Sequence, residues 1–465
     1  MTPAPGTTGP WSGRRLHVVG LGGAGMSAYA LAAAALGAQV TGSDQSDSPY
    51  ADALRRAGIA VAIGHDAANL PAGSDFELVY SSAVPAGNPE RAAARERGVP
   101  ERSRAELLRE LSGLRRTIAV AGAHGKTTTA SMLAHVLRAG GMNPSFLIGG
   151  VLRSAGTNAA WTDGEWLVLE ADESDRSMIG LHAEIAVLTN VELDHHATYG
   201  SLAELREAFR QFLAAAPRAV IWDRPDLLAL RKGPVVAFDA TDVALESGGS
   251  RFAWRGHHVR LRVPGRHNAL NAVAALEASR LAGAPEAGAA AALSDFTGAA
   301  RRFQRLGRTG SGAEVYDDYA HHPTELAATL AAARTLAPRR LVAVFQPHLF
   351  SRTALLARQF GLALAEADVV MVLDVYPARE RAEDFPGVSG LVIAEAAADA
   401  AGGRPVYWMP DRAAARRVLD GLLGPGDLCL VLGAGDVDEL GRALVAHSAG
   451  ADETVPGSAP AGIPA

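Results

Sequence analysis

Lysine is almost absent from this chain. Of the 465 residues only Lys126 and Lys232 are lysines, and arginine supplies the remainder of the 44 basic side chains. Because lysine is kept inside a glycine-rich segment while it is replaced almost everywhere else, this position is expected to need an ammonium group. The formal net charge is −6. The chain therefore lacks the basic excess of nucleic-acid-binding proteins, and we expect no nucleic-acid partner.

Cysteine and long apolar segments are also scarce. Cys429 is the only cysteine, which excludes a disulfide within the chain, and its apolar surroundings at residues 428–432 predict a buried strand thiol. No long apolar run is free of glycine, proline and charge, and residues 1–13 do not resemble a signal peptide. We therefore expect a cytoplasmic protein with no membrane partner.

Alternating strand and helix patterns are abundant by contrast. Hydrophobic residues make up 48% of the sequence and charged residues 20%, which is typical of folded globular proteins. The length predicts about three domains. A pattern of apolar strand, glycine-rich turn and helix begins near residues 16, 117 and 313. We therefore predict three α/β domains with parallel sheets, at residues 1–113, 114–310 and 311–465.

Within these domains the apolar patterns predict individual elements. Strands are expected at residues 16–20, 39–41, 117–121, 166–169, 185–189, 341–345, 369–373 and 428–432, with an alanine-rich helix at 26–36. Residues 239–265 alternate like antiparallel strands and are expected to form a small appendage to the central domain. The tail after about residue 447, rich in alanine, glycine, proline and serine, is predicted to be disordered.

The first glycine-rich turn fits the G-x-G-x-x-G pattern at residues 20–25, between a strand and a helix, with Asp44 about twenty residues farther on. Its bare backbone lets a pyrophosphate approach the amino end of the helix. Taken alone, this motif indicates a nicotinamide dinucleotide site, and a turn that needs glycine only for packing is the structural alternative. A dehydrogenase is therefore one open interpretation.

The second glycine-rich turn is a phosphate loop of the short G-x-x-G-K-T kind. Its amides are expected to cradle the β- and γ-phosphates of a nucleotide, Lys126 to neutralise them, and the Thr127 hydroxyl to face Mg²⁺. The nucleotide-binding residues predicted from it are Gly122, Ala123, His124, Gly125, Lys126, Thr127 and Thr128. A dehydrogenase has no use for this second site.

Acidic and histidine clusters follow two of the predicted strands. Glu170, Asp172, Glu173 and Asp175 come directly after the strand at 166–169, and His195 comes after the strand at 185–189. Side chains at the carboxyl ends of parallel strands can ligate Mg²⁺, although a solvated acidic turn or surface histidine has the same pattern.

Asn268 and Asn271 at a predicted helix start can read a purine edge. Polar groups also crowd together at residues 301–304, 317–323 and 345–352.

These segments, in this order, resemble the Mur ligase family from Val18 to about Val437. The motifs that carry the resemblance are G-L-G-G-A-G-M-S, K-T-T-T, E-A-D-E-S-D, H-N-A-L-N-A, R-R-F-Q, D-D-Y-A-H-H-P-T-E and F-Q-P-H-L-F-S-R-T. The resemblance implies a Rossmann-like N-terminal domain, a P-loop ATPase-like central domain and a Rossmann-like C-terminal domain. It implies an ATP- and Mg²⁺-dependent ligase that adds L-alanine to the lactyl carboxylate of UDP-N-acetylmuramate, through an acyl phosphate, in peptidoglycan precursor synthesis.

The resemblance also assigns roles to particular residues. The UDP-sugar would be bound by Gly22, Gly23, Gly25, Met26, Ser27, Ser81, Ser82 and Asn88. Thr127, Glu170 and His195 would ligate the metal, and Lys126, Glu170, His195 and Arg302 would act in catalysis. Besides the phosphate loop, Asn268 would meet the adenine, Arg302 the γ-phosphate, and Asp318 and His321 the nucleotide. His348 and Arg352 would help place L-alanine.

The chain departs from the family pattern at several positions. Ala123 replaces a usual threonine, Leu349 stands where several members carry arginine, and His196-Ala197 replaces Met-Asp after the metal histidine. Arg210 occupies the place of a lysine that several relatives carbamylate, so we predict no carbamate.

Three alternatives to an L-alanine ligase remain at this point: a recycling ligase that attaches a tripeptide to the same nucleotide sugar, an NAD-dependent oxidoreductase, and a non-catalytic nucleotide-binding regulator. We expect a monomer or a weak homodimer.

Overall fold

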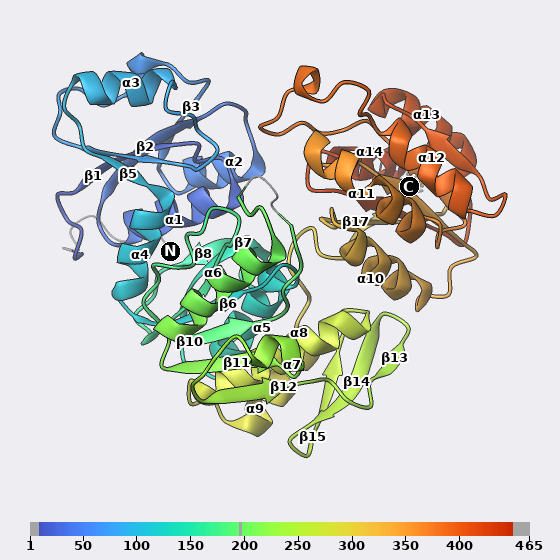
Figure 1. Ribbon diagram of the computed structural model, residues 1–465, viewed down its shortest axis with the longest axis horizontal. Helices are drawn as coiled ribbons and strands as arrows, with labels where there is room; N and C mark the ends of the chain where they lie inside the picture. Colours follow the sequence, from blue (N-terminus) through green and yellow to red (C-terminus); the bar gives the residue numbers. More distant parts are fainter. Residues whose placement is uncertain (1–8, 195–197, 450–465) are drawn as a thin grey trace, which may run out of the picture. The chain divides into compact units, whose positions relative to one another are not determined.

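The computed structural model describes residues 9–194 and 198–449. The chain divides into two compact units, the first ending at Ala300 and the second beginning at Arg301. Within the described residues, the first unit contains three sheets and the second contains one (Figure 1). No helix in the described ranges is both long enough and apolar enough to cross a membrane.

The first sheet has the strand order β3-β2-β1-β4-β5, and all of its pairs are parallel. Its strands are β1 (Arg15–Val19), β2 (Gln39–Asp44), β3 (Ala60–Ile63), β4 (Glu77–Tyr80) and β5 (Glu101–Ser103). They alternate with α1 (Ala24–Ala35), α2 (Pro49–Arg56), the 3₁₀ turn η1 (Ala67–Asn69), α3 (Pro89–Glu96) and α4 (Arg104–Gly113). Because parallel strands end at one edge, the loops after β1 and β4 lie together, as the Rossmann-like prediction requires.

The central sheet has the order β12-β11-β10-β6-β9-β7-β8, in which β8 is antiparallel to β7. Its strands are β6 (Arg116–Ala121), β7 (Ser145–Leu152), β8 (Thr157–Ala160), β9 (Trp166–Glu170), β10 (Ala183–Leu188), β11 (Arg218–Trp222) and β12 (Val235–Phe238). The helices are α5 (Lys126–Ala139), α6 (Leu202–Ala215), α7 (Pro225–Leu228), α8 (Arg266–Leu281) and α9 (Glu286–Ala292), followed by η2 (Leu293–Asp295). Leu133 of α5 and Leu276 of α8 share one core, while Phe209 and Phe212 of α6 belong to the other.

The first sheet and the central sheet share a hydrophobic core. Helix α1 packs against β7 and β8, and Tyr29 of α1 lies in the same apolar cluster as Leu147 of β7. Asn158 of β8 is buried and donates to Ala24 O at 2.7 Å and to Ser27 Oγ at 3.0 Å. This continuous packing explains why the first two domains form one compact unit.

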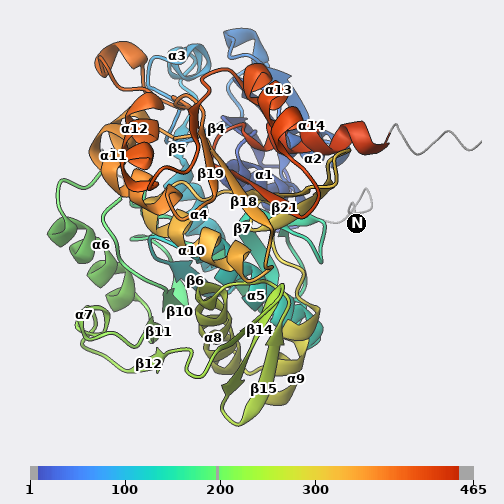
Figure 2. The same ribbon diagram turned by 90° about the vertical axis from the view of Figure 1, so that its right-hand side faces the viewer.

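A third, antiparallel sheet extends the central domain. It consists of β13 (Ala244–Glu246), β14 (Gly249–Trp254) and β15 (His257–Leu261), which lie beside α8 and α9 (Figures 1 and 2). Phe252, Trp254 and Val259 pack into the same core as α5 and α8. The antiparallel appendage predicted at residues 239–265 is confirmed.

The sheet of the second unit has the order β16-β17-β21-β18-β19-β20, parallel except for β16. Its strands are β16 (Gln304–Arg308), β17 (Glu314–Asp318), β18 (Arg340–Phe345), β19 (Val369–Val372), β20 (Val406–Trp408) and β21 (Asp427–Leu432). Alternate residues of β18 face opposite cores. One core includes α10 (Pro323–Arg334), α11 (Phe350–Leu364) and α12 (Leu391–Ala400), and the other includes α13 (Arg412–Leu422) and α14 (Asp438–Ala449). A 3₁₀ turn, η3 (Ala382–Asp384), precedes α12.

The predicted three-domain α/β architecture is confirmed. Cys429 is buried in β21, as predicted. Helix α14 continues to Ala449, and residues 450–465 lie outside the described residues, so the disorder of the tail stays a prediction. The boundaries near residues 113 and 310 remain predictions. The second compact unit begins at Arg301, before the predicted boundary, because β16 pairs with β17.

Candidate functional site

The first glycine loop joins β1 to α1. Gly20 has φ = 82°, a left-handed conformation that glycine adopts without strain. Gly23 is the N-cap of α1 and provides no side-chain cap, so the first turn of the helix presents backbone amides suited to an anion. The Gly22 amide donates to Asp44 Oδ2 at 2.8 Å. Asp44, which made the motif look like a dinucleotide site, is therefore hydrogen-bonded to the loop itself.

Three further predicted sugar-nucleotide residues lie near the end of β4 or beyond it. Ser81 follows β4, and its Cβ would lie 3.0 Å from a Cβ added at Gly20. Ser82 is exposed. Asn88 is buried, and its side-chain oxygen caps α3 by accepting from the amides of Glu90 and Arg91. Ser81 thus borders the glycine loop, whereas the Asn88 side-chain oxygen has a structural role.

Met26 and Ser27 on α1 are also buried. The Ser27 hydroxyl donates to Ala24 O at 3.0 Å and accepts from Asn158 of β8. The Ser27 side chain therefore helps to dock α1 on the central sheet, and Met26 lies in the apolar cluster that the two sheets share. The Ser27 amide donates to Gly23 O at 3.0 Å within the helix, so the amides suited to a ligand are those that precede it.

The phosphate loop lies between β6 and α5, as predicted. Gly122 and Gly125 have φ values of 140° and 81°. A Cβ added at Gly122 would lie 2.1 Å from Thr189 Oγ1, and one added at Gly125 would lie 2.4 Å from Asn271 Oδ1. Both glycines are therefore required by backbone conformation and by close neighbours.

The remaining loop residues are held by the segment after β10. The Ala123 amide donates to Asn190 O at 3.3 Å, and the His124 amide donates to Asn190 Oδ1 at 2.9 Å. His124 Nε2 lies 2.9 Å from a Glu192 carboxylate oxygen. His195, the predicted metal ligand that follows on this segment, and His196-Ala197 lie outside the described residues.

Lys126 is the first residue of α5, and its ammonium group is held by the loop and by an acid. Its Nζ donates to Gly122 O at 2.7 Å and to Glu173 Oε1 at 3.0 Å. Burial alone would lower the pKa of Lys126, but the carboxylates of Glu173, Asp172 and Glu170 more than offset this effect and raise the pKa above its ordinary value. The side chain is therefore a fixed cation at the phosphate loop.

Thr127 and Glu170 form a compact set of oxygen ligands. The Thr127 hydroxyl lies 3.0 Å from each carboxylate oxygen of Glu170, and Thr128 is buried beside it on α5. The Gly149 amide donates to Glu170 Oε2 at 2.8 Å. A hydroxyl and a carboxylate match the preference of Mg²⁺ for hard oxygen ligands, so the residues present fit this ion.

Asn268 and Asn271 lie in the first turns of α8. Asn268 Nδ2 donates to Pro264 O at 2.7 Å, and Asn271 Nδ2 donates to Asn268 Oδ1 at 3.3 Å. Since Asn271 is the neighbour that a side chain at Gly125 would meet, the start of α8 borders the phosphate loop. The structure therefore brings this predicted nucleotide segment and the phosphate loop together.

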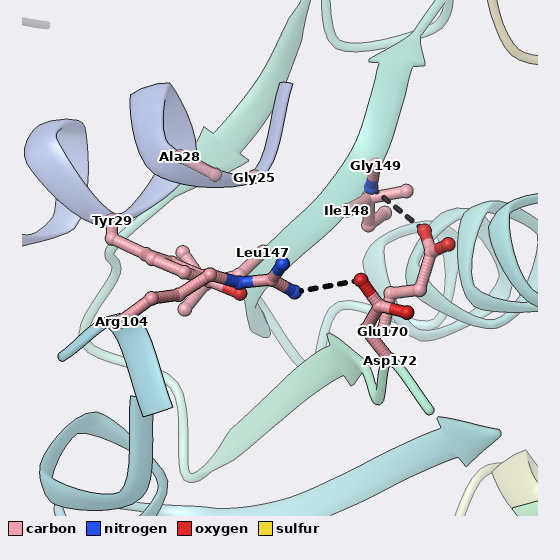
Figure 3. A pocket seen from close by; sticks show the side chains of 9 residues that line it. All are labelled: Gly25, Ala28, Tyr29, Arg104, Leu147, Ile148, Gly149, Glu170 and Asp172. Carbon is pink, nitrogen blue, oxygen red and sulfur yellow. Dashed lines mark hydrogen bonds and ion pairs between the residues drawn. The ribbon is translucent and has the colours of Figure 1, made fainter. Parts of the chain in front are cut away.

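A pocket of about 110 Å³ connects the surroundings of the two glycine loops (Figure 3). Gly25 contributes from the first loop, and Glu170, the partner of Thr127, contributes from beside the second. The side chain of Arg104 enters from α4 and pairs with Asp172 at 3.0 Å. The complete lining is Gly25, Ala28, Tyr29, Arg104, Leu147, Ile148, Gly149, Glu170 and Asp172.

In the second unit, Asp318 organises the segment that carries Arg302. Its carboxylate accepts from the Phe303 amide at 2.7 Å and from the Ala320 amide at 2.8 Å. The Arg302 guanidinium carbon lies 4.9 Å from the centre of the Tyr319 ring. Burial raises the pKa of Asp318 to about 6, although Arg302 and the two amides work in the opposite direction.

The second unit also gathers His321, His348 and Arg352. The rings of His321 and His348 lie 6.0 Å apart, and His348 stacks on Tyr376 at 5.8 Å. Arg352 is buried, with Nη1 3.3 Å from His348 Nδ1. The backbone at Leu349 has φ = 72° and donates its amide to Tyr376 O at 3.0 Å. Asp318 is the last residue of β17, His321 and His348 follow β17 and β18, and Arg302 lies just before β16.

Three residues that lie beside predicted ones were not predicted from the sequence. Arg104 and Tyr29 lie on helices of the first domain, in segments without a recognisable motif. Tyr376 follows β19, and its position after a strand end was the available signal. Arg104 carried no such signal, because its role depends on the packing of α4 beside the central sheet.

Models of one family match most of this chain. The model described as Mur ligase family, catalytic domain, matches residues 15–116. The Mur ligase middle domain matches residues 120–279, and the Mur ligase, glutamate ligase domain, matches residues 301–435.

Individual relatives agree with these matches. UDP-N-acetylmuramate–L-alanine ligase of Rubrobacter xylanophilus is 44% identical over 450 residues, covering 93% of this chain and 100% of the relative. The protein of the same name from Streptomyces coelicolor is 43% identical, with 95% and 99% covered.

Two solved structures are similar over comparable lengths. UDP-N-acetylmuramate-alanine ligase MurC of Thermotoga maritima has a TM-score of 0.82 at 28% identity, covering 94% of this chain and 100% of that chain. A murein peptide ligase of Psychrobacter arcticus has a TM-score of 0.72 at 25% identity, covering 95% and 100%. The two glycine loops, the acidic strand end and these similarities agree, and the chain belongs to the Mur ligase family.

Proposed function

We propose that this chain uses ATP to join L-alanine to the lactyl carboxylate of UDP-N-acetylmuramate, giving UDP-N-acetylmuramoyl-L-alanine, ADP and phosphate. The observation that carries the proposal is the pocket in Figure 3, where Gly25 of the first glycine loop and Glu170 beside the phosphate loop line one space. A sugar nucleotide on the first loop and ATP on the second would direct their reacting groups to this space. The L-alanine ligases at 44% and 43% identity support the choice of substrates.

On the nucleotide side, we propose that the loop from Gly122 to Thr128 binds the phosphates of ATP. Lys126 would neutralise them, and Glu173, 3.0 Å from its ammonium group, would hold the side chain in place. Asn268 at the start of α8 would bind the adenine. Thr127 and Glu170 would hold Mg²⁺, together with His195. When bound, the ion offsets charge on the phosphoryl group during transfer.

On the sugar side, we propose that Gly22, Gly23 and Gly25 bind the diphosphate of the substrate through backbone amides, with Ser81 and Ser82 at the rim. In the second unit, Arg302 would bind the γ-phosphate, and Asp318 and His321 the nucleotide. His348 and Arg352 would bind L-alanine, since a buried arginine beside a stacked histidine suits an amino-acid carboxylate.

The reaction needs activation because a carboxylate is a poor electrophile. Transfer of the γ-phosphoryl group gives an acyl phosphate, the amine of L-alanine attacks the acyl carbon, and phosphate leaves through a tetrahedral intermediate. The chain contributes positioning and fixed charge, from Lys126 and the loop amides, to a reaction in which little covalent chemistry falls to the protein.

The nearest alternative is a ligase that attaches a tripeptide to the same sugar nucleotide, as the similarity to a murein peptide ligase illustrates. The test is phosphate release from ATP with UDP-N-acetylmuramate and either L-alanine, glycine, L-serine or the tripeptide. We expect turnover with L-alanine. Turnover with the tripeptide alone would replace the proposal, and NAD(H) binding without phosphate release would favour the oxidoreductase. ATP binding with no substrate-dependent phosphate release would indicate a regulator.

We also infer that the protein acts in the cytoplasm, where ATP is available, as a monomer or weak homodimer. Sedimentation across a range of protein concentrations, with and without nucleotide, tests the second point.

A further inference from the structure

Arg104 occupies a defined position at the border of the first two domains. It is the first residue of α4, and Ser103 and Glu106 form a capping box that fixes the start of this helix. Its side chain is 15% exposed and reaches across to the acidic segment after β9. Nη2 lies 3.0 Å from Asp172 Oδ2, and Nη1 lies 3.4 Å from Asp175 Oδ2.

The same guanidinium lies beside the first glycine loop. A Cβ added at Gly25 would lie 3.9 Å from Arg104 Cζ and 4.0 Å from Arg104 Nε. Figure 3 shows the Arg104 and Tyr29 side chains running together into the pocket, toward Glu170 and Asp172. Arg104 is thus within reach of a group attached to a ligand on the glycine loop.

Arg104 also has hydrogen-bonding capacity to spare. Its Nε is buried and has no hydrogen-bond partner among the described residues. A guanidinium carries five N–H donors. The Tyr29 hydroxyl and the carboxylates of Asp172 and Asp175 engage part of this set, and the Nε–H remains for a ligand. A buried donor of this kind carries a free-energy cost that an incoming acceptor relieves.

The pocket suits a small carboxylate with a short apolar part. Arg104 is the cationic side chain among the described residues that line it, and Glu170 and Asp172 are the acidic ones. Ala28, Leu147 and Ile148 make part of the wall apolar. An anion entering beside two carboxylates is repelled unless their charge is offset, and the ion pair of Arg104 with Asp172 offsets one of them.

We propose that Arg104 binds the lactyl carboxylate of UDP-N-acetylmuramate and holds it in the pocket for phosphoryl transfer. This inference rests on the proposed function, and it makes Arg104 the residue that distinguishes this substrate from the same sugar nucleotide without the lactyl group. Arg104 remains paired with Asp172 and uses its spare donors for the substrate.

The experiment compares two ligands that share uridine, diphosphate and amino sugar. UDP-N-acetylmuramate carries the lactyl carboxylate, and UDP-N-acetylglucosamine does not. Dissociation constants for both are measured by calorimetry with the full-length protein and its Arg104→Met and Arg104→Lys variants. Arg109→Met is the matched control, because Arg109 is an exposed arginine on the same helix. Thermal unfolding confirms that each variant is folded.

We expect Arg104→Met to weaken binding of UDP-N-acetylmuramate by about 30-fold and that of UDP-N-acetylglucosamine by less than about threefold, the difference expected for one charge-assisted hydrogen-bonded pair. Arg104→Lys keeps a positive charge and should retain part of the preference for UDP-N-acetylmuramate over UDP-N-acetylglucosamine. This variant provides the test if Arg104→Met fails to fold. Arg109→Met should match the unaltered protein. In turnover, the KM for UDP-N-acetylmuramate should rise while the KM for ATP stays unchanged.

If Arg104→Met weakened the binding of both ligands equally, Arg104 would contact the diphosphate or have only a structural role. If the binding of neither ligand were weakened, Arg104 would not belong to the site. Either result overturns the inference. A failure of the proposed function looks different, because the unaltered protein would then release no phosphate with UDP-N-acetylmuramate and L-alanine, whatever the variants bind.

Discussion

The hydroxyl of Thr127 lies 3.0 Å from both carboxylate oxygens of Glu170. The two residues come from different elements, since Thr127 is in the first turn of α5 and Glu170 is the last residue of β9. Gly149 of β7 completes the arrangement, because a Cβ at this position would lie 2.7 Å from Glu170 Oε2. Helix α5 and strands β7 and β9 of the central domain therefore fix one pair of oxygen ligands.

Substitution of this pair should change the metal requirement. We expect Glu170→Gln to raise the Mg²⁺ concentration for half-maximal activity by about tenfold or more, because an amide oxygen carries no charge. Thr127→Ser keeps the hydroxyl, so its Mg²⁺ concentration for half-maximal activity should stay near that of the unaltered protein. Magnesium titrations of phosphate release provide the measurement, and an unchanged titration curve for Glu170→Gln would remove this residue from the metal site.

The two lysines of the chain provide a matched pair of variants. Lys126→Ala should lower the rate at least about 100-fold, on the order of 3 kcal/mol, because it removes the fixed cation of the phosphate loop. Lys232→Ala should leave the rate unchanged, since Lys232 is exposed and distant in sequence from the loop. Steady-state phosphate release measures both, and near-normal turnover by Lys126→Ala would refute the mechanism.

Gly125 and Gly141, at opposite ends of α5, separate backbone strain from steric conflict. Both have positive φ, at 81° and 73°. A Cβ at Gly125 would meet Asn271 Oδ1 at 2.4 Å, whereas one at Gly141 would meet nothing within 4 Å.

Alanine at either glycine should cost about 1–2 kcal/mol in unfolding free energy from left-handed strain. Gly125→Ala should in addition lose ATP binding, because Asn271 or the loop must move. Chemical denaturation and nucleotide titration test this prediction. Equal ATP affinity of the two variants would contradict it.

Glu90 should make the stability of the first domain depend on pH. Its carboxylate is fully buried and lies 2.8 Å from His17 Nε2, 2.8 Å from Ser43 Oγ and 2.9 Å from Asn69 Nδ2. Burial alone would raise the pKa of Glu90, but these hydrogen bonds lower it to about 2. In the unfolded chain the group takes up its proton near 4.5.

Because the unfolded state binds this proton first, the stabilisation is fully present above about pH 4.5 and is lost as the pH falls toward 2. The expected loss is on the order of 3 kcal/mol. Urea unfolding at a series of pH values, for the protein and for Glu90→Gln, gives the measurement. The variant should have a lower unfolding free energy near neutrality, and this free energy should depend less on pH between 4.5 and 2. If the unfolding free energies of the two proteins changed in parallel with pH, the assignment to Glu90 would be contradicted.

The sequence was informative wherever chemistry needs a particular residue at a particular spacing. The strand before Gly122, the helix after Lys126 and the acidic end of β9 were all predictable, because phosphate binding constrains glycine, lysine and hydroxyl positions locally. The same holds for the antiparallel sheet, whose alternation is a local pattern. Buried β21 was likewise visible as a continuous apolar run.

Residues whose role arises from packing were not predictable. Arg104 and Asp172 are 68 positions apart in the sequence, and they meet only because α1 and α4 dock on the central sheet. Ser27 belongs to the glycine-loop motif, yet its hydroxyl accepts from Asn158 of β8 and helps to dock α1, and Met26 lies in the same shared apolar cluster. The Asp44 carboxylate bonds to the loop that it was expected to complement. Tertiary contacts decide such cases, and a motif does not record them.

The burial of Cys429 has a practical consequence for following motion. The apolar interior of β21 raises the pKa of this thiol to about 12, so the native chain should be inert to thiol-directed dyes. A cysteine introduced at Ile63 in the first unit and another at Leu355 in the second, both now exposed, would then be the reactive pair. Fluorescence energy transfer between labels at these positions would follow the separation of the two units as nucleotide and sugar are added, without any native thiol having to be removed first.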